Sequence, residues 1–328
     1  MPFADIVGHG KQLETLIWGL EKDRLHHAYL FLGPEGVGKR TIALSLARAI
    51  HCQERVYDFC DECANCARVR TGKHPDVHLV APLAGKKEIS IQQVRELERE
   101  LNFRPFSGRK KIALLDPASL MNFSAQNALL KTLEEPPSNS LLILLSTSTG
   151  GLLSTLLSRC LRLSFSSLPV EVVANFLASK KGMNRGDAEF LAAVTMGSLG
   201  KATSPNMESL MKRRKVWMKQ ICSLTRGDYR KGMTLAEELA GIREESLEFL
   251  EWVEGWYRDI LIHCVTGSNR GICNLDMVKG VEQQAALYSL EHVLFVLAQA
   301  VMTAARIRRN VNRRMALENF FAKVVRIH

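Results

Sequence analysis

Short runs of apolar residues stand out in the first half of the chain. Four of them span residues 29–32, 77–80, 112–115 and 141–145. Runs of this length are typical of strands that are buried on both faces of a sheet. Segments between them repeat apolar residues at three- and four-residue spacing, which is the pattern of an amphipathic helix. Alternating strands and helices predict an α/β domain with a parallel sheet, ending near residue 165.

Two local signals place helix ends in this region. Ser90 and Gln93 have the spacing of a capping box, in which each side chain accepts a hydrogen bond from the other residue's backbone. Pro136 and Pro137 must end the helix that carries Leu129, because proline has no amide donor.

Beyond residue 165 the pattern changes to one helix after another. The break at Ser204-Pro205 divides this region, so the sequence predicts three parts with bounds 1–165, 166–204 and 205–328. Six apolar residues of the last part recur at helical spacing and are expected to form core: Leu247, Leu250, Val253, Tyr257, Leu261 and Cys264.

Composition narrows the class of protein. The chain has 328 residues, of which 46% are hydrophobic, so it can bury a substantial core and is not expected to be disordered. Its net charge is +10, and basic residues gather in two clusters. Such clusters suit nucleic acid or an acidic partner, and a solvated helix face explains either one equally well. The clusters are Lys212, Arg213, Arg214, Lys215 and Lys219, and Arg306, Arg308, Arg309, Arg313 and Arg314.

Two observations bear on location. The longest nearly apolar stretch, residues 293–305, is too short to cross a bilayer. Residues 1–10 lack the basic head and apolar run of a signal peptide. We therefore expect a cytoplasmic protein with no membrane partner.

A phosphate-binding loop is predicted at residues 33–40, GPEGVGKR, between a strand and a helix. Gly33, Gly36 and Gly38 would let backbone amides converge on an anion at the start of the helix. Lys39 would reach the β and γ phosphates of a nucleotide. The preceding strand and the following helix favour a phosphate-binding loop over a simple turn.

Two substitutions argue against hydrolysis at this loop. Arg40 stands where a serine or threonine hydroxyl normally binds magnesium, and a cation there would repel the metal. Thr41 lies about 100° further around the helix and should not replace that hydroxyl. Asp116 could still contact magnesium, but Pro117 offers no carboxylate to orient the attacking water. ATP and Mg²⁺ binding is left open, whereas efficient hydrolysis is not expected.

Four cysteines follow this region with the spacing C-x7-C-x2-C-x2-C: Cys52, Cys60, Cys63 and Cys66. In a reducing compartment, such spacing favours a structural zinc site over disulfides. An iron–sulfur cluster is the rival, but no further cysteine follows soon after Cys66. A closed four-thiolate site would leave no position for catalysis and would serve to fold a module over about residues 52–66.

Several segments resemble bacterial clamp-loader subunits of the AAA+ class, and the four-cysteine insertion is similar to theirs as well. These segments are residues 5–9 (DIVGH), 27–31 (HAYLF), 74–76 (HPD), 127–137 (NALLKTLEEPP), 158–160 (SRC), 310–312 (NVN) and 316–318 (ALE). Within this group, tau/gamma subunits are motor ATPases, whereas delta prime subunits carry eroded nucleotide motifs. Arg40 and Pro117 favour the delta prime type.

The resemblance implies an architecture and a role. Residues 1–165 would form a RecA-like AAA+ domain, 166–204 a helical lid, and 205–328 a helical collar. The collar would join a hetero-pentamer with tau/gamma and delta subunits of the DNA polymerase III holoenzyme, which loads a sliding clamp on primer-template DNA. Arg159 would act in trans as an arginine finger in a neighbour's ATP site. Gly200 occupies the place where active ATPases often carry a sensing arginine, although Lys201 could replace part of its charge.

Two other functions fit part of the sequence. A tau/gamma-like ATPase would have to tolerate Arg40 and Pro117. A standalone nucleic-acid-binding protein would use the zinc segment and the basic helices.

Overall fold

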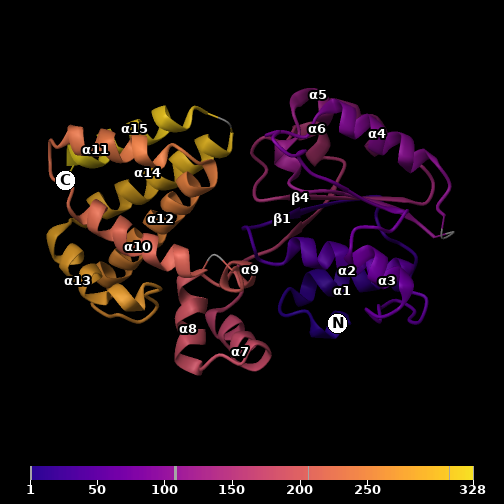
Figure 1. Cartoon of the computed structure of the whole chain (residues 1–328), viewed down its shortest axis with the longest axis horizontal. Helices are drawn as coiled ribbons and strands as arrows, with labels where there is room; N and C mark the ends of the chain where they lie inside the picture. Colours follow the sequence, from indigo (N-terminus) through magenta and orange to yellow (C-terminus); the bar gives the residue numbers. More distant parts are fainter. Residues whose placement is uncertain (1, 107–108, 206, 310, 328) are drawn as a thin grey trace. The chain divides into compact units, whose positions relative to one another are not determined.

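The computed structural model describes residues 2–106, 109–205, 207–309 and 311–327. It divides into two compact units, Met1–Val172 with Ser198–Gly200, and Val173–Gly197 with Lys201–His328 (Figure 1). The three-part division expected from the sequence stays a prediction. Asn310, the first residue of the matched segment 310–312, lies outside the described residues.

The first unit is an α/β domain built on one sheet. Its helices and strands are η1 (Phe3–Asp5), α1 (Gly10–Glu21), β1 (Ala28–Leu32), α2 (Lys39–His51), α3 (Ala64–Arg70), β2 (Val77–Val80), α4 (Ile91–Asn102), β3 (Lys111–Leu115), η2 (Ala118–Leu120), α5 (Phe123–Glu134), β4 (Ser140–Ser146), α6 (Ser154–Leu157) and β5 (Leu161–Ser164). Helices α7 (Val170–Lys181) and α9 (Leu199–Ala202) each contribute to both units.

The sheet has five parallel strands in the order β2-β3-β4-β1-β5. The four strands expected from the apolar runs are confirmed. The capping box at Ser90 and Gln93 is also present at the start of α4. Helix α5 ends at Glu134, just before the two prolines. The α/β fold class is therefore confirmed.

Successive strand residues feed two separate cores, because their side chains point to opposite faces of the sheet. Tyr29 and Phe31 of β1 belong to the core that includes α1, α2 and α3. Leu30, between them, belongs to the core that includes α4 and α5. Figure 1 shows these two groups of helices on opposite sides of the sheet.

Strand β5 was not predicted as a strand. It lies at the sheet edge beside β1, and Leu161, Arg162 and Ser164 are exposed. An edge strand of four residues does not need a continuous apolar run, and its sequence lacks the signal by which the other strands were found.

The second unit is helical in the part that is described, apart from connecting segments. Its remaining elements are α8 (Arg185–Val194), α10 (Met207–Cys222), α11 (Tyr229–Leu239), α12 (Arg243–Thr266), η3 (Leu275–Met277), α13 (Val278–Leu287), α14 (Leu290–Arg308) and α15 (Arg313–Ile327). The predicted core positions on α12 are confirmed for Leu250, Val253 and Tyr257, which are buried, while Leu247 and Leu261 are partly buried against them. Cys264 is exposed, so its assignment to the core is wrong.

Helix α14 corrects the expectation about membrane spans. It has 19 residues and a mean hydropathy of 1.4, so its length and composition would suffice to cross a membrane. The 293–305 stretch was judged too short because the polar and charged ends of this helix were left out. Val293, Val296 and Ala300 are nevertheless buried in the core of the helical unit. These contacts are those of a core helix.

Candidate functional site

The predicted phosphate loop lies between β1 and α2, and its glycines are required by the backbone. A Cβ atom at Gly33 would lie 2.1 Å from the carbonyl oxygen of Phe165, so no side chain fits there. Gly36 and Gly38 have φ angles of 75° and 109°, a region that favours glycine. Gly38 is the N-cap of α2. The loop therefore presents its backbone at a helix N-terminus, which suits an anion.

Other groups of the same unit hold this loop in shape. The carbonyl groups of residues 33–37 each accept a hydrogen bond. The donors are Lys39 Nζ to Gly33 at 2.6 Å and Pro34 at 2.7 Å, Ser198 Oγ to Glu35 at 3.0 Å, Gly200 N to Gly36 at 2.8 Å, and His9 Nε2 to Val37 at 2.8 Å. The loop's carbonyl acceptors are therefore satisfied within the chain.

Lys39 points back onto the loop. Its side chain is buried, and burial lowers the pKa of its ammonium, while the carboxylates of Asp116 and Glu35 act in the opposite direction. Two of the three donors of this ammonium are thus directed at carbonyl groups of the loop itself.

Arg40 and Asp116 form an ion pair across the site. Asp116 directly follows β3, and its Oδ2 lies 3.5 Å from Arg40 Nη1. Burial raises the pKa of Asp116, while Arg40 and Lys39 counteract that rise. The carboxylate that could still have contacted magnesium is thus paired with the arginine that stands at the position of the expected hydroxyl ligand. The two residues are separated by 76 positions in the sequence, so their pairing could not be predicted.

Gly200 packs directly on the phosphate loop. A Cβ atom at this position would lie 2.9 Å from the Cα and carbonyl oxygen of Gly36. Any side chain at position 200, an arginine included, would therefore push this backbone away. The ammonium of Lys201 forms an ion pair with Glu251.

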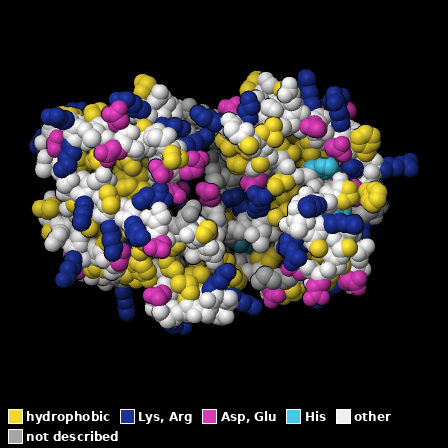
Figure 2. Space-filling model, in the orientation of Figure 1, with side chains coloured by type: hydrophobic (Ala, Val, Ile, Leu, Met, Phe, Trp, Pro, Cys, Tyr) yellow, Lys and Arg dark blue, Asp and Glu magenta, His cyan; other side chains and the backbone are white. Residues whose placement is uncertain are grey.

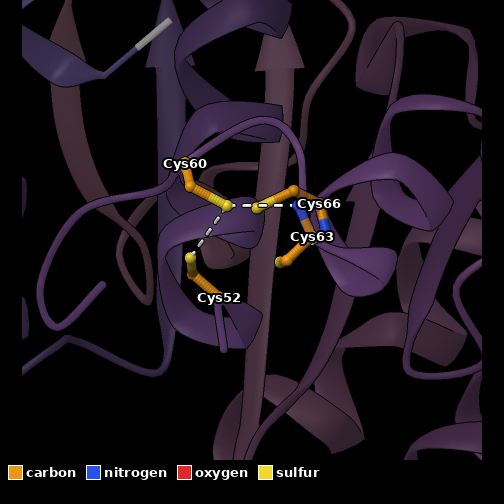
Figure 3. A group of neighbouring side chains, drawn as sticks. All are labelled: Cys52, Cys60, Cys63 and Cys66. Carbon is orange, nitrogen blue, oxygen red and sulfur yellow. Dashed lines mark hydrogen bonds between the residues drawn. The ribbon is translucent and has the colours of Figure 1, made fainter. Parts of the chain in front are cut away.

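The four cysteines of the 52–66 module converge (Figure 3). Their sulfur atoms all lie within 4.8 Å of one another, and the sulfurs of Cys52 and Cys60 are 3.8 Å apart. A tetrahedron of zinc–thiolate bonds of about 2.3 Å has sulfurs about 3.8 Å apart. Backbone amides donate to three sulfurs: Arg55 to Cys52, Cys63 to Cys60, and Cys66 to Cys63. Such donors stabilise thiolates, so the residues fit a structural zinc ion.

The module is attached to the core beside α2. Phe59 is fully buried and contacts Phe3 edge to face at 5.3 Å. The guanidinium of Arg48 lies over the Phe59 ring at 4.2 Å and pairs with Asp61 at 2.5 Å. The cysteine cluster thus fixes a segment that packs against the helix carrying Lys39.

Sequence reasoning missed a second group of potential metal ligands, formed by His51, His74 and Asp76. All three are buried, and their ligand atoms lie within 4.8 Å of one another. Burial lowers the pKa of His51 to about 4. Lys111 Nζ lies 4.0 Å from Asp76 Oδ1, and the amide of Phe106 donates to the same oxygen at 2.8 Å. An ammonium already compensates this carboxylate, so the group is a structural charge cluster. The matched segment 74–76 was its only sequence signal.

Arg159 lies away from the phosphate loop, two residues after the end of α6. Its Nη2 is 2.6 Å from Glu134 Oε1, and its Nη1 donates to the carbonyl of Thr155 at 2.9 Å and to Ser158 Oγ at 3.3 Å. About a third of its side chain is exposed. Among the described residues, these three supply its polar contacts. The structure therefore brings Gly33, Lys39 and Asp116 together in one site and leaves Arg159 in another.

The basic clusters are partly engaged within the chain. Arg213 pairs with Glu245 and Glu248, while the buried Arg214 pairs with Asp276. Arg308 and Arg314 also form ion pairs, whereas Lys215 and Lys219 are exposed. On the face shown in Figure 2, basic side chains are scattered among acidic ones. This pattern is that of ion-paired helix surfaces more than of a continuous nucleic-acid-binding patch.

Comparisons with known proteins agree with one another. The profile of a family described as DNA polymerase III, delta subunit, matches residues 8–169. The delta prime subunit of Pseudomonas aeruginosa is 30% identical over 300 residues, which cover 89% of this chain and 89% of that protein. The delta prime subunit of Bacillus subtilis is 38% identical over 165 residues, or 50% of each chain. The tau subunit of Escherichia coli is 37% identical over 176 residues, which cover 53% of this chain and 27% of that protein.

The extent of these matches separates the relatives. The chain spans half the length of the Bacillus subtilis protein and about a quarter of the tau subunit. The likeness to the Pseudomonas aeruginosa subunit instead runs through nearly nine tenths of both proteins and includes the helical unit. The chain therefore belongs to the delta prime subunit family of DNA polymerase III clamp loaders.

Proposed function

We propose that this chain is a clamp-loader subunit without ATPase activity of its own, which supplies Arg159 to the ATP site of a neighbouring subunit. The observation that carries the proposal is the ion pair between Arg40 and Asp116. It brings a fixed positive charge to the carboxylate that a magnesium ion would need.

Electrostatics and missing groups together oppose hydrolysis. A divalent ion beside Asp116 would meet the guanidinium of Arg40. Pro117 supplies no carboxylate for the attacking water, and the ammonium of Lys39 is bound to the loop itself. If a nucleotide binds at Gly33, Gly36 and Gly38, it would serve the fold or the assembly and would not be turned over.

Arg159 suits action on a neighbour. About a third of its side chain is exposed, and none of its polar contacts among the described residues is with its own chain's phosphate loop. A fixed arginine stabilises the charge that develops on a transferred phosphoryl group, which is how an arginine finger acts. We propose that the neighbour is a tau/gamma-type subunit, a protein of the same kind as the Escherichia coli tau subunit to which 53% of this chain is similar.

The remaining assignments follow from family membership and the site. We propose a hetero-pentamer with tau/gamma and delta subunits, which loads a sliding clamp on primer-template DNA in the cytoplasm. Residues 166–204 would act as the lid and 205–328 as the collar. Zn²⁺ held by Cys52, Cys60, Cys63 and Cys66 would be structural.

The tau/gamma similarity also keeps an ATPase function as a second candidate. Measuring magnesium-dependent ATP hydrolysis by the purified chain, alone and with tau/gamma, delta, clamp and primed DNA, separates the two. The proposal predicts no turnover by the isolated chain and partner-dependent turnover in the assembly. Robust hydrolysis by the isolated chain would make it a motor subunit instead.

A further inference from the structure

We propose that Glu134 is a positioning residue for Arg159, which fixes the direction of the guanidinium before a neighbour's ATP arrives. This inference rests on the proposed function, because it concerns the same arginine. It assigns a specific task to a carboxylate in the matched segment 127–137, whose chemistry the proposed function does not otherwise use.

The pair stands on a rigid base. Glu134 is the last residue of α5, and Arg159 follows α6. The two helices contact each other, and Leu133 of α5 lies in the same buried cluster as Leu156 of α6 and Cys160. Figure 1 shows α5 and α6 side by side over one face of the sheet. Neither end of the ion pair can therefore move far without disturbing a packed core.

The contacts of the guanidinium fix its plane from two sides. Nη1 donates to the carbonyl of Thr155 and to Ser158 Oγ, both on the α6 side. Nη2 lies 2.6 Å from Glu134 Oε1, on the α5 side. Among the described residues, Nε has no hydrogen-bond acceptor. Without Glu134, only the α6 side would hold the group.

Orientation matters because an exposed arginine side chain has many rotamers, and binding must select one of them. A guanidinium that is already directed loses less conformational entropy when it meets the phosphate. The carboxylate also carries a negative charge, which would weaken Arg159 as a phosphate ligand. Orientation and charge thus predict opposite effects of removing Glu134, and the two can be distinguished experimentally.

The chain supplies a matched control at the next position. Glu135 has the same charge, is exposed, and forms no ion pair among the described residues. Changing Glu135 alters the local charge by the same amount without removing a contact to Arg159. Glutamine at position 134 keeps an acceptor oxygen for Nη2 but removes the charge.

The test uses the chain assembled with tau/gamma, delta, clamp and primed DNA, and measures kcat and KM for ATP. Glu134→Ala is expected to lower kcat about two- to fivefold with KM nearly unchanged, the range for one exposed ion pair. Glu134→Gln should restore most of the rate, and Glu135→Ala should match the unaltered chain. Thermal melting of each variant shows whether it is folded. Arg159→Ala gives the rate expected when the arginine is lost completely.

The outcomes are separable. If Arg159→Ala has no effect, the proposed function itself fails. If Arg159→Ala lowers the rate but Glu134→Ala does not, only the positioning role fails. A higher rate in both Glu134→Ala and Glu134→Gln would show that the carboxylate restrains Arg159 by its charge, which also overturns this inference.

Discussion

Two arginine–carboxylate pairs in the same unit differ in position and surroundings. Arg40 and Asp116 meet at 3.5 Å beside the phosphate loop, and the carboxylate is the less exposed partner. Arg159 and Glu134 meet at 2.6 Å at the ends of α6 and α5, and here the carboxylate is half exposed. Helices α2 and α5 cover opposite faces of the sheet. Under the proposed function, the same pairing chemistry would obstruct a metal in one place and hold a guanidinium for a neighbouring subunit in the other.

The proposed function requires a nucleotide-binding fold that keeps its shape without hydrolysing ATP. Gly200 and Lys39 fasten the phosphate loop to its own unit, so the scaffold keeps its shape without catalytic work. That scaffold also carries β4, α5 and α6, which hold Arg159. The proposed loss of hydrolysis at one site thus need not affect the geometry of the other.

The largest effect is expected from the cysteine module, which lies on the same face of the sheet as α2 and Arg40. Removal of zinc by a chelator, or Cys60→Ser, should destabilise the first unit by several kcal/mol, because metal-binding free energy contributes directly to folding. Zinc analysis measures the metal content of each variant, and thermal melting measures its stability. Cys264→Ser, which changes an exposed cysteine outside the cluster, should retain about one zinc per chain. Equal zinc content and stability in all variants would contradict a structural metal site.

A smaller effect is expected from restoring the magnesium ligand. Arg40→Thr supplies a hydroxyl and frees Asp116 from its ion pair. ATP affinity of this variant should become about tenfold tighter with magnesium than with EDTA, a difference of about 1.4 kcal/mol. Hydrolysis should stay low because Pro117 is unchanged. Arg40→Lys keeps the cation and should show no magnesium dependence in a fluorescent-nucleotide titration. Equal dependence in Arg40→Lys would refute the role assigned to the charge.

The smallest effect is a pH dependence of stability. Burial raises the pKa of Asp116 in the folded chain, so its carboxyl stabilises the fold when protonated and loses this contribution as pH rises through that pKa. The positive charge of Arg40 stabilises the ionised carboxylate of Asp116 and so reduces this loss of stability. Arg40→Ala should therefore destabilise the chain at pH 7, by about 1 kcal/mol or less because Arg40 is exposed, and should have no effect where Asp116 is protonated.

Urea unfolding of Arg40→Ala and of the unaltered chain, at pH 7 and at a pH low enough to protonate Asp116, measures this difference in stability. In an Asp116→Asn background, Arg40→Ala should change stability equally at the two pH values. A pH-dependent effect that persists in that background would assign it to another group.

The sequence predicted much of the fold because buried strands leave a simple signal. The strand at 141–145 is buried on both faces and was found, as was β2, whose four residues include three apolar ones; β5 alternates apolar with polar residues, is mostly exposed, and was missed. The loop glycines and the four cysteines were identified from spacing alone. The partners of Arg40 and Arg159 were not, because Asp116 and Glu134 come from distant segments that only the folded sheet brings near.

The most direct test of the comparison is the rate of clamp loading by the assembled complex with either arginine replaced. Arg159→Ala should lower the rate by roughly tenfold or more, since an arginine finger acts on the transition state. Arg40→Ala should leave the loading rate within about twofold of that of the unaltered complex, because a site that does not hydrolyse ATP has no turnover to lose. Normal loading with Arg159→Ala, or an equal loss with Arg40→Ala, would contradict the division of roles between the two sites.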